Sequence, residues 1–305
     1  MLYFRSLDGV EIKNSWLTIG SFDGMHRGHH AILVKLVDEA RKNRFPAVVI
    51  TFFPNPAVVL GKRQNAWYLN TPDERAELIG DLGVDVVVMH PFNPDVANLT
   101  AYEFIQHLDR HLDLKHLLVG PDFALGKGRE GNIQRLAELG DVFGYSLEVM
   151  PPVVNSDVVI SSSQIRAKLF EGDVAQAARL LGRPYRITGK VVPGDARGKA
   201  IGIPTANLSV WSERTIPKSG VYVCKAWIGE RVWGSVANIG VRPTFEDGVV
   251  SPRVEAHLLD FDADLYGQEI KLDFVARVRD EQRFPSVQAL IEQIHRDIEA
   301  ARAIL

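Results

Sequence analysis

Before Gly182, hydrophobic positions follow two alternating patterns, one typical of strands and the other of helices. Runs of apolar and β-branched residues predict strands over Trp16–Ile19, Ala47–Phe53, Val84–Met89, His116–Val119 and Tyr145–Met150. Between them, apolar residues at helical spacing predict helices over His29–Arg41, Pro72–Leu82, Ala101–Leu112 and Ile133–Leu139. Strands and helices in alternation are typical of crossover units, so we expect an α/β domain with a mostly parallel sheet and helices on both faces.

Polar residues at the expected helix starts support these boundaries. In a capping box, a Ser or Thr and a Glu or Gln three residues later satisfy the free amides of the first helical turn. The pattern occurs at Thr71 with Glu74, at Thr100 with Glu103, and at Ser161 with Gln164. Asp173 is expected to begin one further helix that ends near Gly182.

After Gly182 the chain is interrupted by Gly and Pro, and its apolar residues mostly alternate. Predicted strands are Val221–Ile228 and Val232–Ala237, which form a hairpin around Gly229, then Val254–Leu259 and Ile270–Val278. Short strands without intervening helices indicate a β-barrel or a sandwich. A final helix is expected after a cap at Ser286, with its buried face formed by Val287, Leu290, Ile291, Ile294 and Ile298. We therefore predict two domains, residues 1–183 and 184–305.

Composition narrows the class of protein. The 305 residues include 46% hydrophobic and 24% charged residues, enough for two ordinary cores. A net charge of −3 gives no electrostatic reason to expect a nucleic acid or an anionic membrane as partner. Cys224 is the only cysteine, which excludes an intramolecular disulfide and fits a reducing compartment. The start lacks a signal-peptide core, and the longest apolar run is too short to span a bilayer, so we expect a cytoplasmic protein.

The strongest motif, Gly20–His29 (GSFDGMHRGH), follows the first strand of this prediction and opens the first helix. Glycines let backbone amides approach an anion, and a helix N-terminus favours negative charge. His26 and His29 add donors for the same phosphate. Two alternatives remain open: the histidines cap or pack against the helix, or they bind a metal together with Asp23.

Two further motifs lie in the first domain. The run Gly126–Gly131 matches G-x-G-x-x-G, but it starts too far from its strand to be a dinucleotide fingerprint. Gly120–Lys127 resembles a P-loop with one residue too many, so we interpret Gly120–Arg129 as a mobile basic loop, with a solvated surface loop as the alternative. Ile160–Arg166 offers serine hydroxyls and a guanidinium to a second phosphate, unless it is a simple helix cap.

In the second domain, Gly189–Lys199 is rich in glycine and cations and is predicted to be a loop that approaches phosphates. Thr205 and Asn207, two apart on an extended stretch, point the same way and can present oxygens to Mg²⁺. Glu255 lies within an apolar strand, where a carboxylate is paired or catalytic unless the strand is an exposed edge.

Together these motifs identify a family. The sequences GSFDGMHRGHH, TFFPNP, GPDFALG, ISSSQIR, LLGRPY, GIPTANL, NIGVRPTF, VEAHLLDF, DLYG and RDEQRF follow one another along the chain. This ordered set resembles the bacterial bifunctional riboflavin kinase/FMN adenylyltransferases, also called FAD synthetases. The resemblance implies a Rossmann-like nucleotidyltransferase domain, a six-stranded kinase barrel, and riboflavin, FMN and ATP as small-molecule substrates.

For the first domain, the resemblance implies transfer of AMP from ATP to FMN. It assigns catalysis to His26, His29 and Arg166. It assigns ATP binding to Gly20, Ser21, Phe22, Asp23, Gly28, Ser161 and Ser162. It assigns FMN binding to Asn55, Asp122 and Phe123.

For the second domain, the resemblance implies phosphorylation of riboflavin by ATP. Glu255 is the implied general base on the ribityl 5′-hydroxyl, and Thr205 and Asn207 are the implied ligands of Mg²⁺. The ATP phosphates are assigned to Gly194, Arg197 and Lys199, and the flavin to Arg279 and Phe284. Nothing in the sequence predicts the oligomeric state.

The chain departs from the family pattern at three positions. Asn55 stands where a histidine is common, Ser163 replaces a threonine, and Leu125 replaces an aromatic residue. Two rival hypotheses remain: adenylylation of another phosphorylated small molecule, and a flavin-sensing module without turnover.

Overall fold

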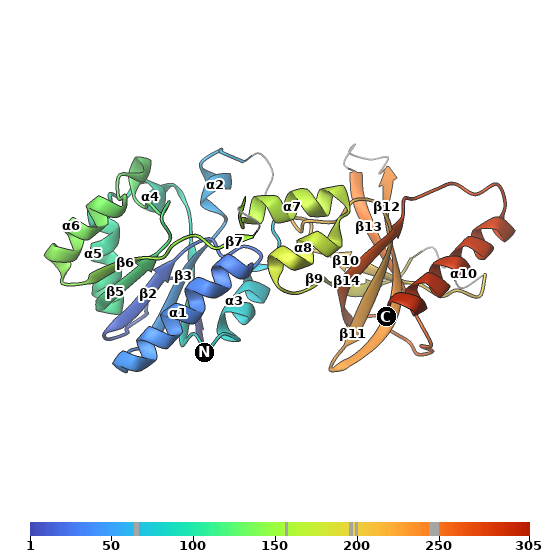
Figure 1. Ribbon diagram of the computed structural model, residues 1–305, viewed down its shortest axis with the longest axis horizontal. Coiled ribbons are helices and arrows are strands. Elements are labelled where there is room, and N and C mark those ends of the chain that lie inside the picture. The colour runs from blue at the N-terminus through green and yellow to red at the C-terminus, as the bar shows by residue number, and fades with distance from the viewer. Residues whose placement is uncertain (64–66, 156–157, 195–197, 199–200, 244–249) are drawn as a thin grey trace. The chain divides into compact units, whose positions relative to one another are not determined.

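The computed structural model describes residues 1–305 except 64–66, 156–157, 195–197, 199–200 and 244–249 (Figure 1). The chain divides into two compact units, Met1–Ser162 and Ser163–Leu305, and each is described by itself.

The first unit is built on a parallel six-stranded sheet with the order β1-β4-β3-β2-β5-β6. Its strands are β1 (Leu2–Phe4), β2 (Ser15–Ile19), β3 (Ala47–Phe53), β4 (Val86–Pro91), β5 (Leu114–Val119) and β6 (Ser146–Val149). A small antiparallel ribbon follows, made of β7 (Val154–Asn155) and β8 (Val158–Val159). The predicted parallel sheet is confirmed, whereas β1 was not predicted because only its three residues form a partly exposed edge.

Helices cover both faces of this sheet, as predicted (Figure 1). The helices are α1 (Arg27–Asn43), α2 (Pro56–Val59), α3 (Pro72–Gly80), α4 (Pro94–Asn98), α5 (Ala101–Leu112) and α6 (Ile133–Phe143), with a short 3₁₀ turn η1 (Lys127–Arg129). One core lies between the sheet and α5 and α6, and the other between the sheet and α1 and α3. Capping boxes at Thr71 and Thr100 are confirmed.

The second unit begins in α7 (Ser162–Glu171) and continues through α8 (Val174–Leu181). Asp173 caps α8, and Gly182 ends it in the left-handed conformation, as the sequence predicted. Helix α8 packs against strands of the β-barrel that follows, so it belongs to the core of this unit. The capping box at Ser161 stays a prediction.

The barrel of the second unit is closed, with the strand order β10-β13-β12-β11-β14-β9. Its strands are β9 (Tyr185–Val192), β10 (Ala206–Val210), β11 (Gly220–Ile228), β12 (Arg231–Pro243), β13 (Val250–Leu258) and β14 (Glu269–Arg279). The predicted β11–β12 hairpin is confirmed. The loop predicted over Gly189–Lys199 is wrong in its first part, because Gly189 to Val192 pair with β10 as the end of β9. Glycine fits there because an added Cβ would lie 3.0 Å from the Leu208 side chain.

The chain ends in α10 (Val287–Ile304), which Ser286 caps as predicted. The predicted buried face is wrong at Val287, whose side chain is 61% exposed. The contacts with the barrel come later in the helix, from Ile294, Ile298 and Ala301. An apolar residue in the first turn has no barrel surface to cover, so helical spacing alone could not place it.

Candidate active sites

The Gly20–His29 loop lies at the carboxyl end of β2, in the middle of the parallel sheet. The sheet extends through β3 on one side of β2 and through β5 on the other, so the strand order changes direction here. Open α/β sheets bind ligands at such a point. Phe22, Gly24 and Met25 all adopt positive φ angles. The loop therefore follows a tightly turned path into α1.

His26 and His29 form a stacked pair at the start of α1. Their ring centroids are 3.6 Å apart, and Nδ1 of His26 accepts a hydrogen bond from the amide of His29 at 3.3 Å. Because Nδ1 of His26 accepts this hydrogen bond, Nε2 is the nitrogen of the ring that can donate. Burial, and then the nearby His26 and Arg75, lower the pKa of His29 well below its usual value. The His29 ring can therefore serve as a neutral hydrogen-bond donor beside the helix N-terminus.

The two alternatives for the histidines now differ in support. His26 does cap α1, so a structural role coexists with its place in the loop. Among the described residues, no group of His, Cys, Asp and Glu could hold a metal ion. The Asp23 carboxylate instead accepts a hydrogen bond from the amide of Leu69 at 2.8 Å.

Thr51 and Arg75 stabilise the Gly20–His29 loop through hydrogen bonds, and neither was predicted as a site residue from the sequence. The guanidinium of the fully buried Arg75 donates to Thr51 Oγ1 at 3.1 Å, and Thr51 Oγ1 donates to the carbonyl of Ser21 at 3.0 Å. Of these two residues, Thr51 could have been recognised from the sequence, because a buried hydroxyl in an apolar strand needs a hydrogen-bond partner. The Arg75 contact joins α3 to β3 and leaves no trace in local sequence.

The serine motif meets the histidine loop within the first unit. Ser162 Oγ donates to the carbonyl of Asp23 at 2.8 Å. Gly28 packs against His26, since an added Cβ would lie 3.1 Å from the His26 ring. In the second unit, Arg166 is 9% exposed and donates to Ser163 Oγ at 3.2 Å.

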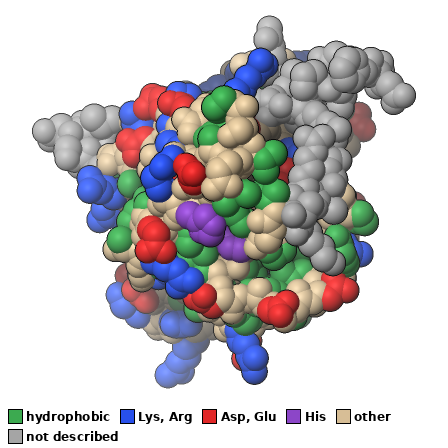
Figure 2. All heavy atoms as spheres, turned by 90° about the vertical axis from the view of Figure 1, so that its right-hand side faces the viewer, with side chains coloured by type: hydrophobic (Ala, Val, Ile, Leu, Met, Phe, Trp, Pro, Cys, Tyr) green, Lys and Arg blue, Asp and Glu red, His purple; other side chains and the backbone are tan. Residues whose placement is uncertain are grey.

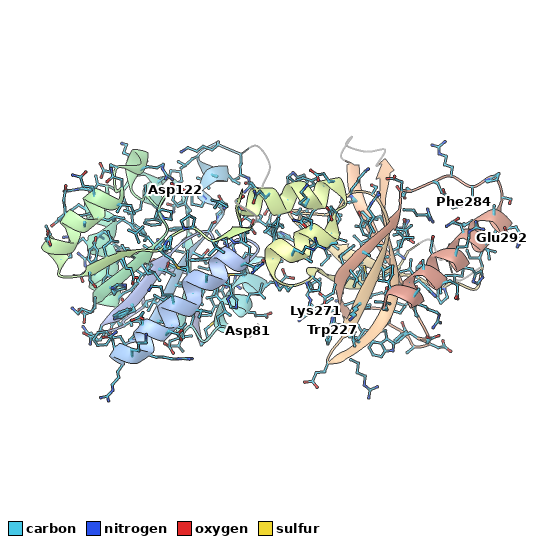
Figure 3. All side chains as sticks on the ribbon, in the orientation of Figure 1. Asp81, Asp122, Trp227, Lys271, Phe284 and Glu292 are labelled. Atoms are coloured by element: carbon cyan, nitrogen blue, oxygen red, sulfur yellow. The ribbon has the colours of Figure 1, made fainter. Side chains whose placement is uncertain are left out.

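Residues predicted to bind FMN occupy different environments. Asn55 is 7% exposed, and its Oδ1 caps α2 by accepting from the amide of Ala57. Asp122 is exposed after β5 (Figure 3), while Phe123 packs against the core under α5. The Gly120–Arg129 segment, predicted as a mobile loop, is closed by paired backbone hydrogen bonds between Leu125 and Gly131.

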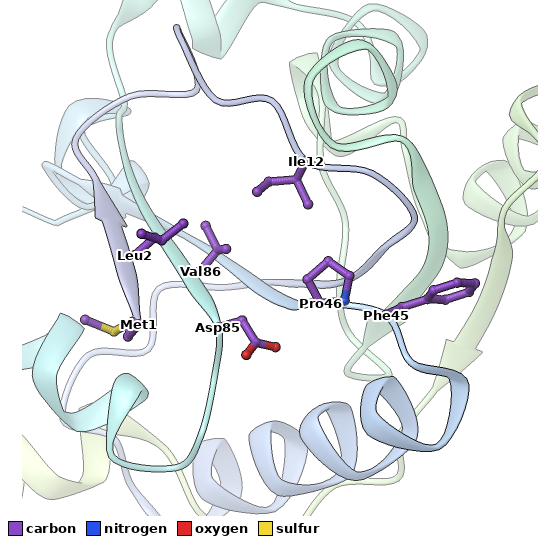
Figure 4. Close-up of a pocket in the computed structure, with 7 residues that line it drawn as sticks. All are labelled: Met1, Leu2, Ile12, Phe45, Pro46, Asp85 and Val86. Atoms are coloured by element: carbon purple, nitrogen blue, oxygen red, sulfur yellow. The ribbon is translucent and has the colours of Figure 1, made fainter.

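Two cavities of the first unit lie away from the motifs. One of about 530 Å³ is found at the amino ends of the strands, and its lining is Met1, Leu2, Ile12, Phe45, Pro46, Asp85 and Val86 (Figure 4). Another of about 380 Å³ lies near the end of β4, beside His90 and His107. Neither lining includes a residue predicted from the motifs.

On the barrel, Asn207 and Glu255 are paired neighbours on β10 and β13. Glu255 Oε2 lies 3.5 Å from Thr205 Oγ1, and the Glu255 side chain is 27% exposed. The alternative of an exposed edge strand is wrong, because β13 pairs with β10 on one side and β12 on the other. The apolar residues that alternate with Asn207 along β10 and with Glu255 along β13 are buried. Thr205, Asn207 and Glu255 therefore form a polar set on the opposite face of the strands.

Two glycines approach the same polar set closely. A Cβ on Gly194 would lie 2.1 Å from Asn207 Nδ2, and one on Gly198 would lie 3.2 Å from Thr205 Oγ1. Gly194 and Gly198 thus lie close to Asn207 and Thr205, which are oxygen donors of the kind Mg²⁺ prefers. The residues present fit that ion. Arg197 and Lys199 lie outside the described residues.

Arg253 is a further member of this set, and sequence reasoning missed it. Its Nε lies 2.8 Å from Glu255 Oε1 and donates to Asn207 Oδ1, also at 2.8 Å. No motif of the resemblance includes this residue.

Arg279 and Phe284 lie together near α10. The Arg279 guanidinium is 5.7 Å from the centre of the Phe284 ring, on the segment before α10 (Figure 3). The same guanidinium makes a bidentate pair with the buried Asp297 carboxylate, with a closest distance of 2.7 Å. Arg279 therefore anchors α10 to β14.

The face of the molecule drawn in Figure 2 carries no patch of one dominant charge. On the face in Figure 2, Lys and Arg side chains alternate with Asp and Glu. This distribution agrees with the small net charge of −3. Among the described residues, no helix is long and apolar enough to cross a membrane.

Fold and sites together define a two-part transferase class, in which an α/β nucleotide-binding unit precedes a barrel with a carboxylate and oxygen-ligand site. Comparisons agree: the family profile "FAD synthetase" matches residues 10–164, and the profile "Riboflavin kinase" matches residues 181–305. The chain belongs to the bifunctional riboflavin kinase/FMN adenylyltransferase family.

Relatives of that name match along most of the chain. The protein from Escherichia coli is 40% identical, covering 94% of this chain and 91% of the relative. The Bacillus subtilis relative is 36% identical, covering 95% and 92%. A solved structure from Streptococcus pneumoniae, described as a macrolide-efflux protein, has a TM-score of 0.89 and 31% identity, covering 99% and 98%.

Proposed function

We propose that the chain makes FAD from riboflavin in two steps, in domains 1–183 and 184–305. Riboflavin and ATP give FMN and ADP in the second domain, and FMN and ATP give FAD and pyrophosphate in the first. This boundary lies at the change from helix to strand after the left-handed Gly182 and near residue 181, where the riboflavin kinase profile begins. It differs from the division into compact units after Ser162, because α7 and α8 count with the barrel there. The observation that carries the proposal is the presence in one chain of the stacked histidine pair and the Asn207–Glu255 pair.

In the first domain, His26 and His29 donate hydrogen bonds to the triphosphate of ATP at the α1 N-terminus. Gly20, Ser21, Phe22, Asp23 and Gly28 shape the loop that receives it. An FMN phosphate oxygen attacks the α-phosphorus, a new P–O bond forms, and pyrophosphate leaves. A neutral His29 suits this step, because it stabilises charge on the phosphates without changing its protonation state near neutral pH.

Three groups of side chains complete the first site in this proposal. Ser161, Ser162 and Arg166 hold the phosphates from the start of α7. Asn55, Asp122 and Phe123 contact FMN. The hydrogen bond from Ser162 to the Asp23 carbonyl supports this assignment for the serine motif.

In the second domain, Glu255 accepts the proton of the ribityl 5′-hydroxyl as that oxygen attacks the γ-phosphorus of ATP, and ADP leaves. An alcohol is too weak an acid to ionise at neutral pH, so a positioned carboxylate is required. Thr205 and Asn207 would hold Mg²⁺, which neutralises charge on the transferred phosphoryl group when bound.

The remaining residues of the second site bind the substrates in this proposal. Gly194, Arg197 and Lys199 contact the ATP phosphates, and Arg279 and Phe284 contact the flavin. We place the enzyme in the cytoplasm, where its single cysteine, buried Cys224, stays reduced.

A time course tests the proposed function. The purified chain is mixed with riboflavin, ATP and Mg²⁺, and flavins are separated by chromatography at intervals. We expect FMN first and then FAD. Binding of FMN without consumption of ATP would favour a flavin-sensing module instead, and preference for another phosphorylated substrate would contradict the flavin assignment.

A further inference from the structure

We propose that the Arg253 guanidinium competes with the divalent ion of the kinase site for the Asn207 side-chain oxygen. It occupies this oxygen in the metal-free site and leaves it when the metal–nucleotide binds. The proposal rests on the kinase function proposed above. It concerns a residue of this chain that lies outside the proposed set of kinase residues.

The position of Arg253 follows from the strand. Arg253 and Glu255 are two residues apart on β13, so their side chains leave the same face. Asn207 faces Glu255 directly across the β10–β13 pairing. The guanidinium therefore lies between the proposed base and a proposed metal ligand, and the salt bridge to Glu255 measures 2.8 Å.

In this arrangement Asn207 Oδ1 is already engaged by the Arg253 guanidinium. An amide oxygen has two lone pairs. In the structure, Nε and Nη2 of Arg253 both donate to Asn207 Oδ1. A cation that binds this oxygen must displace at least one of these hydrogen bonds.

Charge strengthens the competition. A guanidinium is positively charged at all relevant pH values, and a dication within a few ångströms repels it. The Arg253 side chain is 29% exposed, so it can turn towards solvent when the metal–nucleotide binds. In the absence of metal, Arg253 keeps Asn207 and Glu255 in place.

The test measures binding of Mn²⁺ to the full-length protein with ADP, by the electron paramagnetic resonance signal of free Mn²⁺. Binding that disappears in Asn207→Ala is assigned to the kinase site. Arg253→Gln is compared with Arg302→Gln, a control that removes an exposed pair with Asp260. Near-ultraviolet circular dichroism confirms that each barrel is folded.

We expect Arg253→Gln to bind Mn²⁺ at the kinase site about fivefold or more tightly than the parent chain, since a competing charge is gone. Arg302→Gln should match the parent, and Arg253→Lys should gain less than Arg253→Gln because it keeps the charge.

Unchanged or weaker Mn²⁺ binding in folded Arg253→Gln would overturn the inference while the parent still makes FMN. Absence of Asn207-dependent binding in every variant, together with no FMN formation by the parent, would overturn the proposed kinase function and this inference with it.

Discussion

Acid should destabilise the first unit through His90, at the end of β4. The side chain is 6% exposed, and its Nδ1 accepts a hydrogen bond from the amide of Leu7 at 3.3 Å. Burial, and then the neighbouring His107, lower the pKa of His90 to about 4 from a usual 6.5. Asp8 opposes this change, but burial is the larger cause.

The sign and size follow from proton binding. Above pH 6.5 neither state binds the proton, so the full stability is present. As the pH falls from 6.5 towards 4, the unfolded chain takes up a proton that folded His90 does not, and stability is lost. The gap between 6.5 and about 4 corresponds to about 3 kcal/mol.

The assay is urea unfolding of the parent chain and of His90→Asn at pH 7 and pH 4. Asparagine keeps an acceptor for the Leu7 amide but does not titrate. Other titrating groups lower the free energy of unfolding equally in both proteins, so the difference between the proteins reports His90 alone. We expect the parent to lose about 3 kcal/mol more than the variant between the two pH values. An equal loss of unfolding free energy in the parent and the variant would refute the claim that His90 causes the acid sensitivity.

Three further predictions concern single substitutions. Thr51→Val removes two hydrogen bonds, to the Ser21 carbonyl and from Arg75, each worth about 1 kcal/mol. It should raise the KM for ATP in FAD synthesis roughly fivefold, with Thr18→Val as a buried control on β2, and equal effects of the two changes would contradict a role specific to the loop. Asp297→Asn leaves a guanidinium of β14 without its charged partner and should lower stability in urea unfolding by about 3 kcal/mol; no change would show that the pair does not anchor α10. Gly194→Ala forces Asn207 to move and should raise the KM for ATP in riboflavin phosphorylation roughly tenfold, with FAD synthesis from FMN unchanged; loss of both steps would contradict the separation of sites.

Local signals predicted the elements well where they acted within a few residues. Ala101–Leu112 was predicted with its true bounds, because a capping box at Thr100 and a regular apolar face agree. The hairpin around Gly229 was equally clear. Val287 was misplaced because helical spacing shows which face is apolar but not where the barrel ends.

Contacts between distant segments were not predictable in the same way. Arg75 reaches Thr51 across α3 and β3, and Arg253 joins β13 to β10 at Asn207. Neither arginine stands in a recognisable motif, and an arginine on a helix or strand is usually solvated. The family motifs predicted the residues of the two candidate sites, whereas only the structure showed the neighbouring arginines that contact them.

The most direct test of two separate sites is flavin chromatography with Glu255→Gln and His29→Ala, each alone and then mixed, starting from riboflavin, ATP and Mg²⁺. Glu255→Gln should leave riboflavin unchanged yet convert added FMN to FAD, and His29→Ala should accumulate FMN. The mixture should make FAD, because each variant supplies the step that the other lacks. Loss of both steps in either folded variant, or no FAD from the mixture, would contradict the account.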